Sequence, residues 1–312
     1  MVHSADKQTT ADYWSENTAG SNPFSPEVYW LAQARVQRRF QRKAVGGRDY
    51  ATWARYCVGE FLGPRAPVAR TLSIGCGSGV LERELHSLNA FQHCVALDIA
   101  PGAIEQAVRA ARAAGISNIH FQVQDVEHSV LPRGHFDAVW FNGSLHHIGA
   151  LERVCQQVRH ALKPDGWLFF NEYVGANHFG FDATQRLAME HAFGLIPARF
   201  RRSFAPGSWG QVQEAVALPD PREVARVDPS EAVRSADILE VVRQHFDVVV
   251  QNPCGGSLLQ FVLHGIAGNF REDDPDSLHI LEMLFAVEDA LIASGSLKSD
   301  FVAVAARPLS GG

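Results

Sequence analysis

The chain has 312 residues, of which 46% are hydrophobic and 20% charged, and its formal net charge is −6. This composition is typical of a globular protein, and the acidic balance argues against general nucleic-acid binding. No apolar run reaches the ~18 residues that a membrane span needs. The polar segment Met1 to Gly20 lacks the apolar core of a secretory signal, and the five scattered cysteines include no Cys-x-x-Cys pair. We therefore expect a cytoplasmic protein with reduced thiols, no metal site, no membrane partner and no nucleic-acid partner.

Residues 1–66 are expected to form an N-terminal helical arm. Residues 1–20 are polar and predicted to be loosely ordered, whereas helices are predicted at about 26–45 and 48–62, the second ended by Gly63-Pro64. The helical spacing of four arginines predicts a solvated basic face, with an anion-attracting patch as the alternative: Arg35, Arg38, Arg39 and Arg42.

Strands and helices then alternate. Strands are predicted at 71–74, 93–98, 119–123, 136–141 and 167–174, and the helices between them at about 80–89, 101–114 and 150–162. The turn Lys163-Pro-Asp-Gly166 precedes the fifth strand. This alternation predicts an α/β fold with a doubly wound, mostly parallel sheet.

The rhythm is interrupted after the fifth strand. A single helix is predicted at about 182–195, followed by a helix at 235–245, strands at 246–251 and 301–306, and a mostly helical stretch at 256–294. We expect one domain over 67–312 with cap-like insertions at about 175–230 and 257–294, because long connections in compact domains tend to be functional.

Three glycines at alternate positions separate the first strand from its helix. Gly75, Gly77 and Gly79 precede a helix that begins near Val80. Without side chains, a ligand can approach backbone N–H groups, and the helix N-terminus adds partial positive charge. A tight strand–helix turn also uses glycine, so this loop alone does not establish a binding site.

Polar residues stand where successive strands are predicted to end, the edge at which open parallel sheets bind ligands. Asp98 lies 19 residues beyond Gly79, close to the usual interval to an acid that binds ribose hydroxyls. Asp125 follows the next strand and is placed to accept from an adenine amino group. Each acid alone could be a helix cap or a solvated loop residue. Their joint placement, with Asn142 and Glu172 at the next two strands, predicts a nucleoside site.

Six stretches within residues 71–174 resemble the class I S-adenosylmethionine-dependent methyltransferases, in the broad family with a small-molecule methyltransferase domain. They are Leu72–Gly79, Ala96–Ile99, Gln124–Val126, Phe136–Asn142, Leu145–His147 and Leu162–Trp167. Their order and spacing match the family over about a third of the chain. Outside this segment the resemblance is only topological.

The resemblance implies an enzyme with S-adenosylmethionine as its cofactor. It also implies a Rossmann-like sheet of seven strands in the order 3-2-1-4-5-7-6, the last antiparallel, with helical insertions. The cofactor-binding residues that it implies are Gly75, Gly77 and Gly79 at the methionine part, Asp98 and Ile99 at the ribose, Asp125 and Val126 at adenine, and Asn142 beside the methionine end.

Two residues are candidate catalytic groups. A sulfonium methyl is already electrophilic, so a base matters only where the acceptor holds its proton tightly. His146 lies just past the fourth strand and is the predicted base, with Glu172 as a second candidate. In some members of the family a histidine at this position acts as base and an N-terminal tyrosine joins it, for which Tyr13 is the nearest match. The alternative is that the histidine only packs or hydrogen-bonds locally.

We expect methyl transfer to an O, N or C nucleophile of a small molecule, such as a specialised metabolite. A dinucleotide site is disfavoured because Val80 stands where the Rossmann fingerprint needs its third glycine. Two alternatives remain: a macromolecular acceptor, and a cofactor-binding protein of this fold with another reaction or a partner-assisting role. The acceptor and the oligomeric state stay open.

Overall fold

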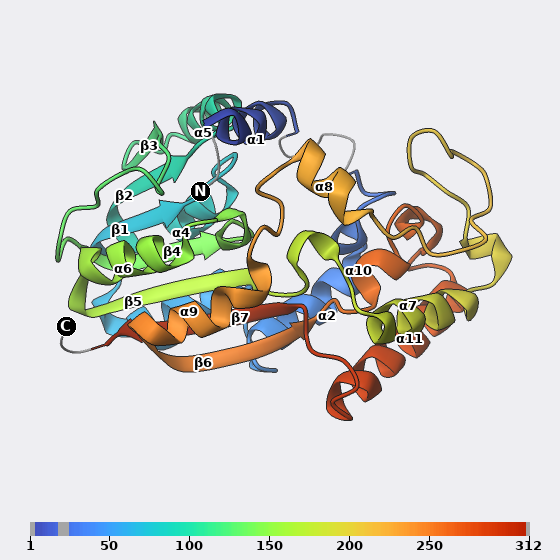
Figure 1. Cartoon of the computed structure of the whole chain (residues 1–312). Helices are drawn as coiled ribbons and strands as arrows, with labels where there is room; N and C mark the ends of the chain where they lie inside the picture. The colour runs from blue at the N-terminus through green and yellow to red at the C-terminus, as the bar shows by residue number, and fades with distance from the viewer. Residues whose placement is uncertain (1–3, 18–24, 310–312) are drawn as a thin grey trace.

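A seven-stranded sheet forms the centre of the computed structural model, which describes residues 4–17 and 25–309. The strands are β1 (Val68–Ile74), β2 (Phe91–Asp98), β3 (Ile119–Val123), β4 (Phe136–Asn142), β5 (Leu162–Tyr173), β6 (Phe246–Gly255) and β7 (Phe301–Pro308). Their order is β3-β2-β1-β4-β5-β7-β6 (Figure 1). β7 pairs antiparallel with β5 and β6, and the other pairs are parallel. The predicted fold class and strand order are confirmed.

Helices cover both faces of the sheet. On one face, α6 (Leu151–Ala161) and α9 (Ile238–His245) pack side by side (Figure 1) and bury Leu72 and Val139. The opposite face packs against α3 (Trp53–Cys57), α4 (Val80–Ser87) and α5 (Pro101–Ala113), where the core includes Trp140 and Phe169. Because both faces are covered, the central strands are apolar almost throughout. The carboxyl edge of the parallel strands is left as the place for a ligand.

The predicted turn before the fifth strand is a bulge inside β5. Phe136 pairs with Leu162 and Ala138 pairs with Trp167, so residues 163–166 of β5 stand opposite the single residue Asp137 of β4. Pro164 has no backbone N–H and cannot donate a hydrogen bond to the β-ladder, so it suits an irregular position in the strand. β5 is therefore longer than predicted and begins at Leu162.

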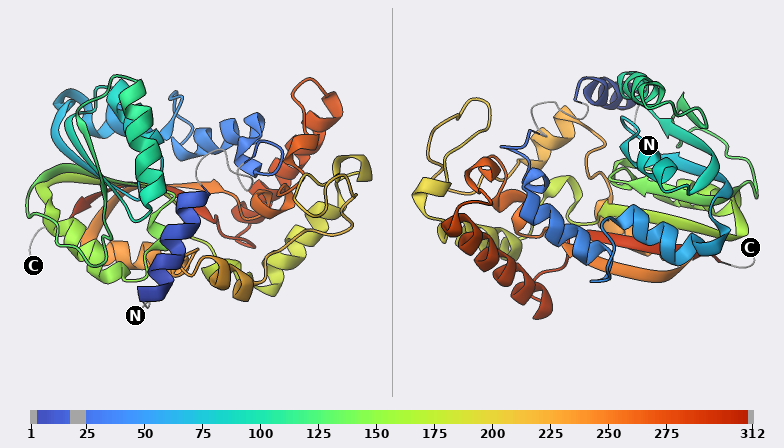
Figure 2. Two further views of the ribbon diagram at one scale, coloured as in Figure 1. Left: turned by 90° about the horizontal axis from the view of Figure 1, so that it is seen from above. Right: turned by 180° about the vertical axis from the view of Figure 1, so that it is seen from behind.

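The N-terminal arm is more regular than predicted, and its helices have different bounds. Residues 4–16, predicted to be loosely ordered, form α1 (Ser4–Glu16), which packs on the start of α5 (Figures 1 and 2). The rest of the predicted 1–20 segment is described only at Asn17. The helix predicted at 26–45 is split into a 3₁₀ turn at Trp30–Ala32 and α2 (Ala34–Ala44), because the Gln33 side chain caps α2 by accepting from Val36 N–H. The helix predicted at 48–62 is α3 followed by a π-helical turn at Val58–Leu62.

The two insertions carry most of the remaining helices. They are α7 (Ala183–Gly194), α8 (Pro221–Val227), α10 (Leu259–Val262) and α11 (Pro275–Ala293), and α7, α10 and α11 gather beyond one end of the sheet (Figures 1 and 2). α8 was not expected from the sequence. None of the helices within the described ranges is long and apolar enough to cross a membrane.

A buried carboxylate joins these helices to the N-terminal arm. Glu288 of α11 is fully buried and accepts hydrogen bonds from the backbone N–H groups of Gly256, Leu258 and Leu259. Its other oxygen lies 2.8 Å from the Arg39 guanidinium of α2.

The basic face of α2 is thus partly an intramolecular interface and partly solvated, because the side chains of Arg38 and Arg42 are exposed. Three of its four arginines pair with acids that lie on α11 or just before it: Arg35 with Glu282, Arg38 with Glu272 and Arg39 with Glu288 and Asp289.

Candidate functional site

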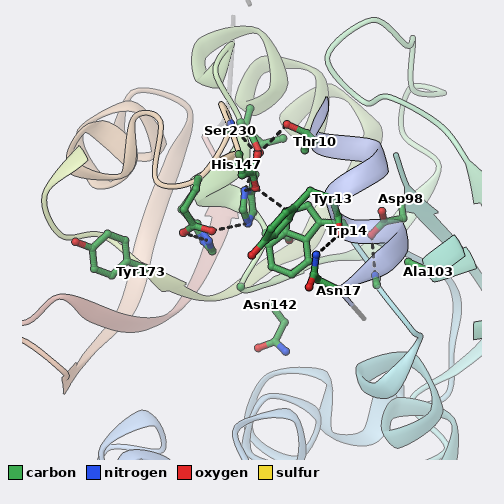
Figure 3. Close-up of a pocket in the computed structure, with 18 of the residues that line it drawn as sticks. Thr10, Tyr13, Trp14, Asn17, Asp98, Ala103, Asn142, His147, Tyr173 and Ser230 are labelled. Carbon is green, nitrogen blue, oxygen red and sulfur yellow. Dashed lines mark hydrogen bonds and ion pairs between the residues drawn. The ribbon is translucent and has the colours of Figure 1, made fainter. Parts of the chain in front are cut away.

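A cavity of about 1230 Å³ lies at the carboxyl edge of the sheet. Its walls come from the ends of β1, β2, β4 and β5, from α1, and from both insertions. Figure 3 shows Tyr13 and Trp14 of α1 between Asp98 on one side and His147 on the other. The topology therefore brings together strand ends, the N-terminal helix and segments more than a hundred residues later in one site.

The three glycines of the loop have different constraints. All three have positive φ, between +52° and +73°. A Cβ at Gly75 would lie 2.3 Å from the Ser144 side chain and one at Gly79 would lie 2.9 Å from Phe121, whereas one at Gly77 would meet open space. Gly75 and Gly77 line the cavity, but Gly79 is the N-cap of α4 behind it. Glycine is thus required at position 79 by packing against Phe121. The sequence pattern alone could not distinguish this requirement from contact with a ligand.

Asp98 connects the end of β2 to the glycine loop. Its Oδ2 accepts from Gly77 N–H and its Oδ1 from Ala100 N–H, each at 2.8 Å. Burial raises the pKa of Asp98 above its ordinary value, and these backbone hydrogen bonds limit the rise. Asp98 and the adjacent Ile99 both line the cavity.

The other residues predicted at the nucleoside end lie in the same cavity. Asp125 and Val126 line it after β3, where Asp125 accepts from Glu127 N–H and lies 2.7 Å from His128 Nδ1. Lys7 of α1, missed by the sequence analysis, lies 2.9 Å from the Glu127 carboxylate. Asn142 lines the cavity at the end of β4, so seven of the eight predicted cofactor positions, all but Gly79, line one cavity.

The two catalytic candidates are in contact, but only one faces the cavity. Nδ1 of His146 lies 2.7 Å from Oε2 of Glu172, whose Oε1 accepts from the N–H groups of Ser144 and Leu145. Glu172 is 1% exposed and stands behind His146, which lines the cavity. Burial disfavours the imidazolium, but the carboxylates of Glu172, Glu231 and Asp228 outweigh it, so the pKa of His146 is raised.

His147 is held by a second set of acceptors. Its Nδ1 lies 2.9 Å from Ser230 Oγ, and that hydroxyl donates to Asp228 Oδ1 at 2.8 Å. Burial and the positive charge of His146 lower the pKa of His147 to about 4. His147 is therefore neutral near pH 7, whereas the pKa of His146 is shifted in the opposite direction.

Asp228 also fastens α1 over the cavity. It accepts from Thr10 Oγ1 and from Trp14 Nε1, each at 2.8 Å, and the Trp14 ring packs edge-on against His147 (Figure 3). Burial opposes the ionised form, but His147 and the hydrogen bonds from Ser230 and Thr10 lower the pKa of Asp228. These contacts explain why a helix that is polar on all sides is held in place.

The segment that carries Asp228, Ser230 and Glu231 was not predicted from the sequence to belong to the site. Glu231 lies across from His146 and His147 and lines the cavity, as does Tyr13, whose pKa is raised by burial and by the charges of Glu231 and Asp228. The segment lies in an irregular connection, so neither a helical or strand periodicity nor a position at the end of a strand indicated that it belongs to the site. Its one local signal is an Asp-Pro-Ser turn, which is common in loops.

Comparison with known proteins identifies the part of the chain that holds the glycine loop. Residues 71–166 match the model of a family described as methyltransferase domain. The malonyl-[acyl-carrier protein] O-methyltransferase of Methylovorus sp. (strain MP688) is 28% identical over 154 residues, which cover 46% of this chain and 52% of that protein. The chain thus matches about half the length of this curated relative.

Solved structures share the fold at low sequence identity. Geranyl diphosphate C-methyltransferase from Streptomyces coelicolor A3(2) has a TM-score of 0.55 at 12% identity, covering 99% of this chain and 100% of that one. The [4+2]-cyclase SpnF has a TM-score of 0.52 at 15% identity, covering 98% and 97%. These likenesses show the class I methyltransferase fold, and the pair illustrates that the fold alone does not decide the reaction.

Proposed function

We propose that this chain, in which residues 71–166 are a methyltransferase domain, transfers a methyl group from S-adenosylmethionine to an O, N or C nucleophile of a small molecule. One observation carries the proposal: the cavity that contains Gly77 and Asp98 also contains His146 and Tyr13. A donor bound at the first pair and an acceptor at the second would then be neighbours in one cavity, as methyl transfer requires.

The residues at the nucleoside end fit this cofactor. A Cβ at Gly77 would occupy open space in the cavity, so its absence leaves room for a ligand against the loop. Each oxygen of Asp98 holds one backbone N–H and retains a lone pair for a ribose hydroxyl. Asp125 is proposed to accept from the adenine amino group, and Asn142 to lie beside the methionine end. When bound, S-adenosylmethionine supplies an electrophilic sulfonium methyl.

On the acceptor side, the chain offers groups that hold protons and exclude water. His146 Nδ1 is occupied by Glu172, which leaves Nε2 toward the cavity as the predicted site of proton transfer. Glu172 is proposed to act through His146, as a positioning residue. The aromatic rings of Tyr173, Phe179 and Phe261 line the same region and form an apolar wall.

The two insertions are proposed to determine the acceptor. Each contributes lining residues, for example Val224 from the first and Phe261 from the second. Neither lies within residues 71–166.

The test uses the full-length chain with methyl-labelled S-adenosylmethionine. Label would be followed by mass spectrometry into a panel of amines, phenols, alcohols and carboxylates, and into protein and RNA fractions from a lysate. Label in a small molecule, lost in Asp98→Asn, is the expected result. Label confined to macromolecules, or cofactor binding without transfer to any fraction, would contradict the proposal.

A further inference from the structure

We propose that His146, His147 and Glu231 form a binding site for one divalent transition-metal ion on the acceptor side of the cavity. The ligand atoms that these three side chains offer all lie within 4.8 Å of one another. The inference goes beyond the proposed function, and it revises the expectation of no metal site, which was based on cysteine spacing.

Both histidines direct the same ring nitrogen at the same carboxylate. Nε2 of His146 lies 3.6 Å from Oε1 of Glu231, and Nε2 of His147 lies 3.9 Å from its Oε2. Both separations exceed the ~3.2 Å limit of a good N–H···O hydrogen bond. Over residues 4–17 and 25–309, no group donates a hydrogen bond to the Glu231 carboxylate. The three side chains therefore surround a gap instead of bonding to one another.

The partners behind the rings fix the tautomer that a metal needs. His146 Nδ1 faces the Glu172 carboxylate, which can only accept, so this nitrogen carries the proton. His147 Nδ1 faces Ser230 Oγ, whose own proton goes to Asp228, so this nitrogen is also a donor. In the neutral ring, each Nε2 then has a free lone pair toward Glu231. Carboxylates and hydroxyls that hold the remote nitrogen in this way are the usual support of metal-binding histidines.

The ligand atoms of the three side chains could hold one ion after moving slightly closer together. Ligand atoms ~2.1 Å from a tetrahedral or octahedral ion stand roughly 3.0–3.4 Å apart. The observed 3.6 and 3.9 Å exceed this range by about 0.2–0.9 Å, which rotation of the Glu231 side chain can close. Two imidazoles and one carboxylate select Zn²⁺, Fe²⁺, Co²⁺ or Ni²⁺, whereas Mg²⁺ and Ca²⁺ prefer oxygen ligands.

Such an ion would retain coordination positions toward the cavity. An acceptor hydroxyl or amine bound there would lose its proton more readily, since a bound cation lowers the pKa of its ligand. The lone pair of His146 Nε2 cannot hold an ion and also take a proton. The metal site and the general-base role of His146 are therefore mutually exclusive, and binding measurements can distinguish them.

The experiment measures metal binding without relying on turnover. The full chain is freed of metal with a chelator and titrated with Co²⁺, read by its visible absorption, and with Zn²⁺ by calorimetry; Mg²⁺ is the comparison ion. The variants are His147→Ala, Glu231→Gln and Glu172→Gln. Glu223→Gln is the matched control, because it removes a cavity carboxylate outside the cluster. Circular dichroism and S-adenosylhomocysteine binding check that each variant is folded.

We expect one Co²⁺ or Zn²⁺ per chain, with binding abolished in His147→Ala and Glu231→Gln and unchanged in Glu223→Gln. Glu172→Gln should weaken binding by about 10–100-fold, the usual effect of losing the partner of a metal-binding histidine. Absence of Co²⁺ and Zn²⁺ binding, or binding that Glu231→Gln leaves unchanged, would overturn the site. Methyl transfer that persists after chelation would leave the proposed function intact, whereas metal binding without any transfer would count against that function alone.

Discussion

Glu172 lies behind His146, with its Oε2 at 2.7 Å from the ring Nδ1 and its Oε1 on two backbone N–H groups. The carboxylate is 1% exposed, so its charge acts on the ring and the adjacent backbone and not on solvent. It thereby fixes both the orientation of the imidazole and the nitrogen that carries the proton.

Substitution of Glu172 by Gln should lower kcat by at least about tenfold, or ~1.4 kcal/mol. The amide oxygen can still accept from Ser144 and Leu145, but the amide NH₂ then faces Nδ1 of His146 and forces the opposite tautomer. Affinity for S-adenosylhomocysteine, measured by calorimetry, should not change, because Glu172 does not line the cavity. An unchanged kcat would show that the orientation of His146 is irrelevant to turnover.

Substitution of His146 by Asn should reduce kcat by roughly 10²–10⁴-fold, the typical cost of losing a group that handles the acceptor proton. Asparagine keeps polarity but neither basicity nor an imidazole nitrogen. Cofactor affinity should stay within about threefold, a change of ~0.7 kcal/mol. Steady-state kinetics at saturating acceptor provide the measurement. Near-normal turnover in this variant, together with loss of turnover in His147→Asn, would assign the reaction to the neighbouring ring.

Substitution of Asp98 by Asn should weaken S-adenosylhomocysteine binding by about 1–3 kcal/mol, the range for disrupting buried hydrogen bonds. Asp98 receives Gly77 N–H and Ala100 N–H, so the variant also loosens the glycine loop. Calorimetry gives the affinity, and a denaturation curve gives the accompanying loss of stability. A large loss of stability with unchanged affinity would mean that Asp98 only supports the loop.

Substitution of Asp228 by Asn should release α1. The amide loses one of the two acceptor oxygens that hold Thr10, Trp14 and Ser230. Hydrogen exchange in the peptide that contains residues 7–16 should become faster, by about 5–150-fold for a loss of 1–3 kcal/mol. Asp220→Asn is the control, since Asp220 caps α8 through Arg222 N–H and should affect only that helix. Equal exchange rates in α1 for both variants would show that Asp228 does not hold this helix in place.

Protonation of Glu82 should make stability depend on pH. Its side chain is fully buried, and burial raises the pKa of Glu82 from 4.5 to about 7. Between these two values the folded state binds more protons than the unfolded state, so stability falls as pH rises from ~4.5 to ~7, by about 3 kcal/mol. Urea denaturation across this range should show the decline, and Glu82→Gln should reduce its slope.

Asp300 provides a comparison for Glu82, because burial also raises the pKa of Asp300 to about 7. Asp300→Asn should remove a separate part of the same slope, and the double variant should flatten it further. A slope that is the same in wild type and both single variants would show that neither carboxyl titrates near pH 7.

The sheet and the part of the cavity at the ends of β1, β2 and β3 were predictable because both depend on local patterns. Apolar runs bounded by turn residues gave the strands, and the position of an acid after each strand placed Asp98 and Asp125 at one edge. Gly79 shows the limit of this reasoning. The same glycine pattern is required by contact with a ligand and by contact with Phe121, and only coordinates distinguish the two.

The part of the cavity around His146, His147 and Glu231 was less predictable because it depends on contacts between distant segments. α1 has no apolar stripe, and Trp14 is fixed by Asp228, which is 214 residues away. Glu231 follows a turn with no periodicity, so its position opposite His146 arises only from the path of the insertion. Glu172, the second candidate base, is buried behind His146 and does not line the cavity, which its place near the end of β5 could not reveal.

The Arg39–Glu288 pair restricts how this chain can be recombined with its relatives. Glu288 is fully buried and also holds three backbone N–H groups at the start of α10, so a chimera that exchanges only the second insertion would leave Arg39 facing a foreign α11. Removing one partner of a buried pair typically costs about 3–5 kcal/mol. Exchange of acceptor specificity by segment swapping should therefore move α2 together with α10 and α11, although α2 lies more than two hundred residues earlier in the gene product.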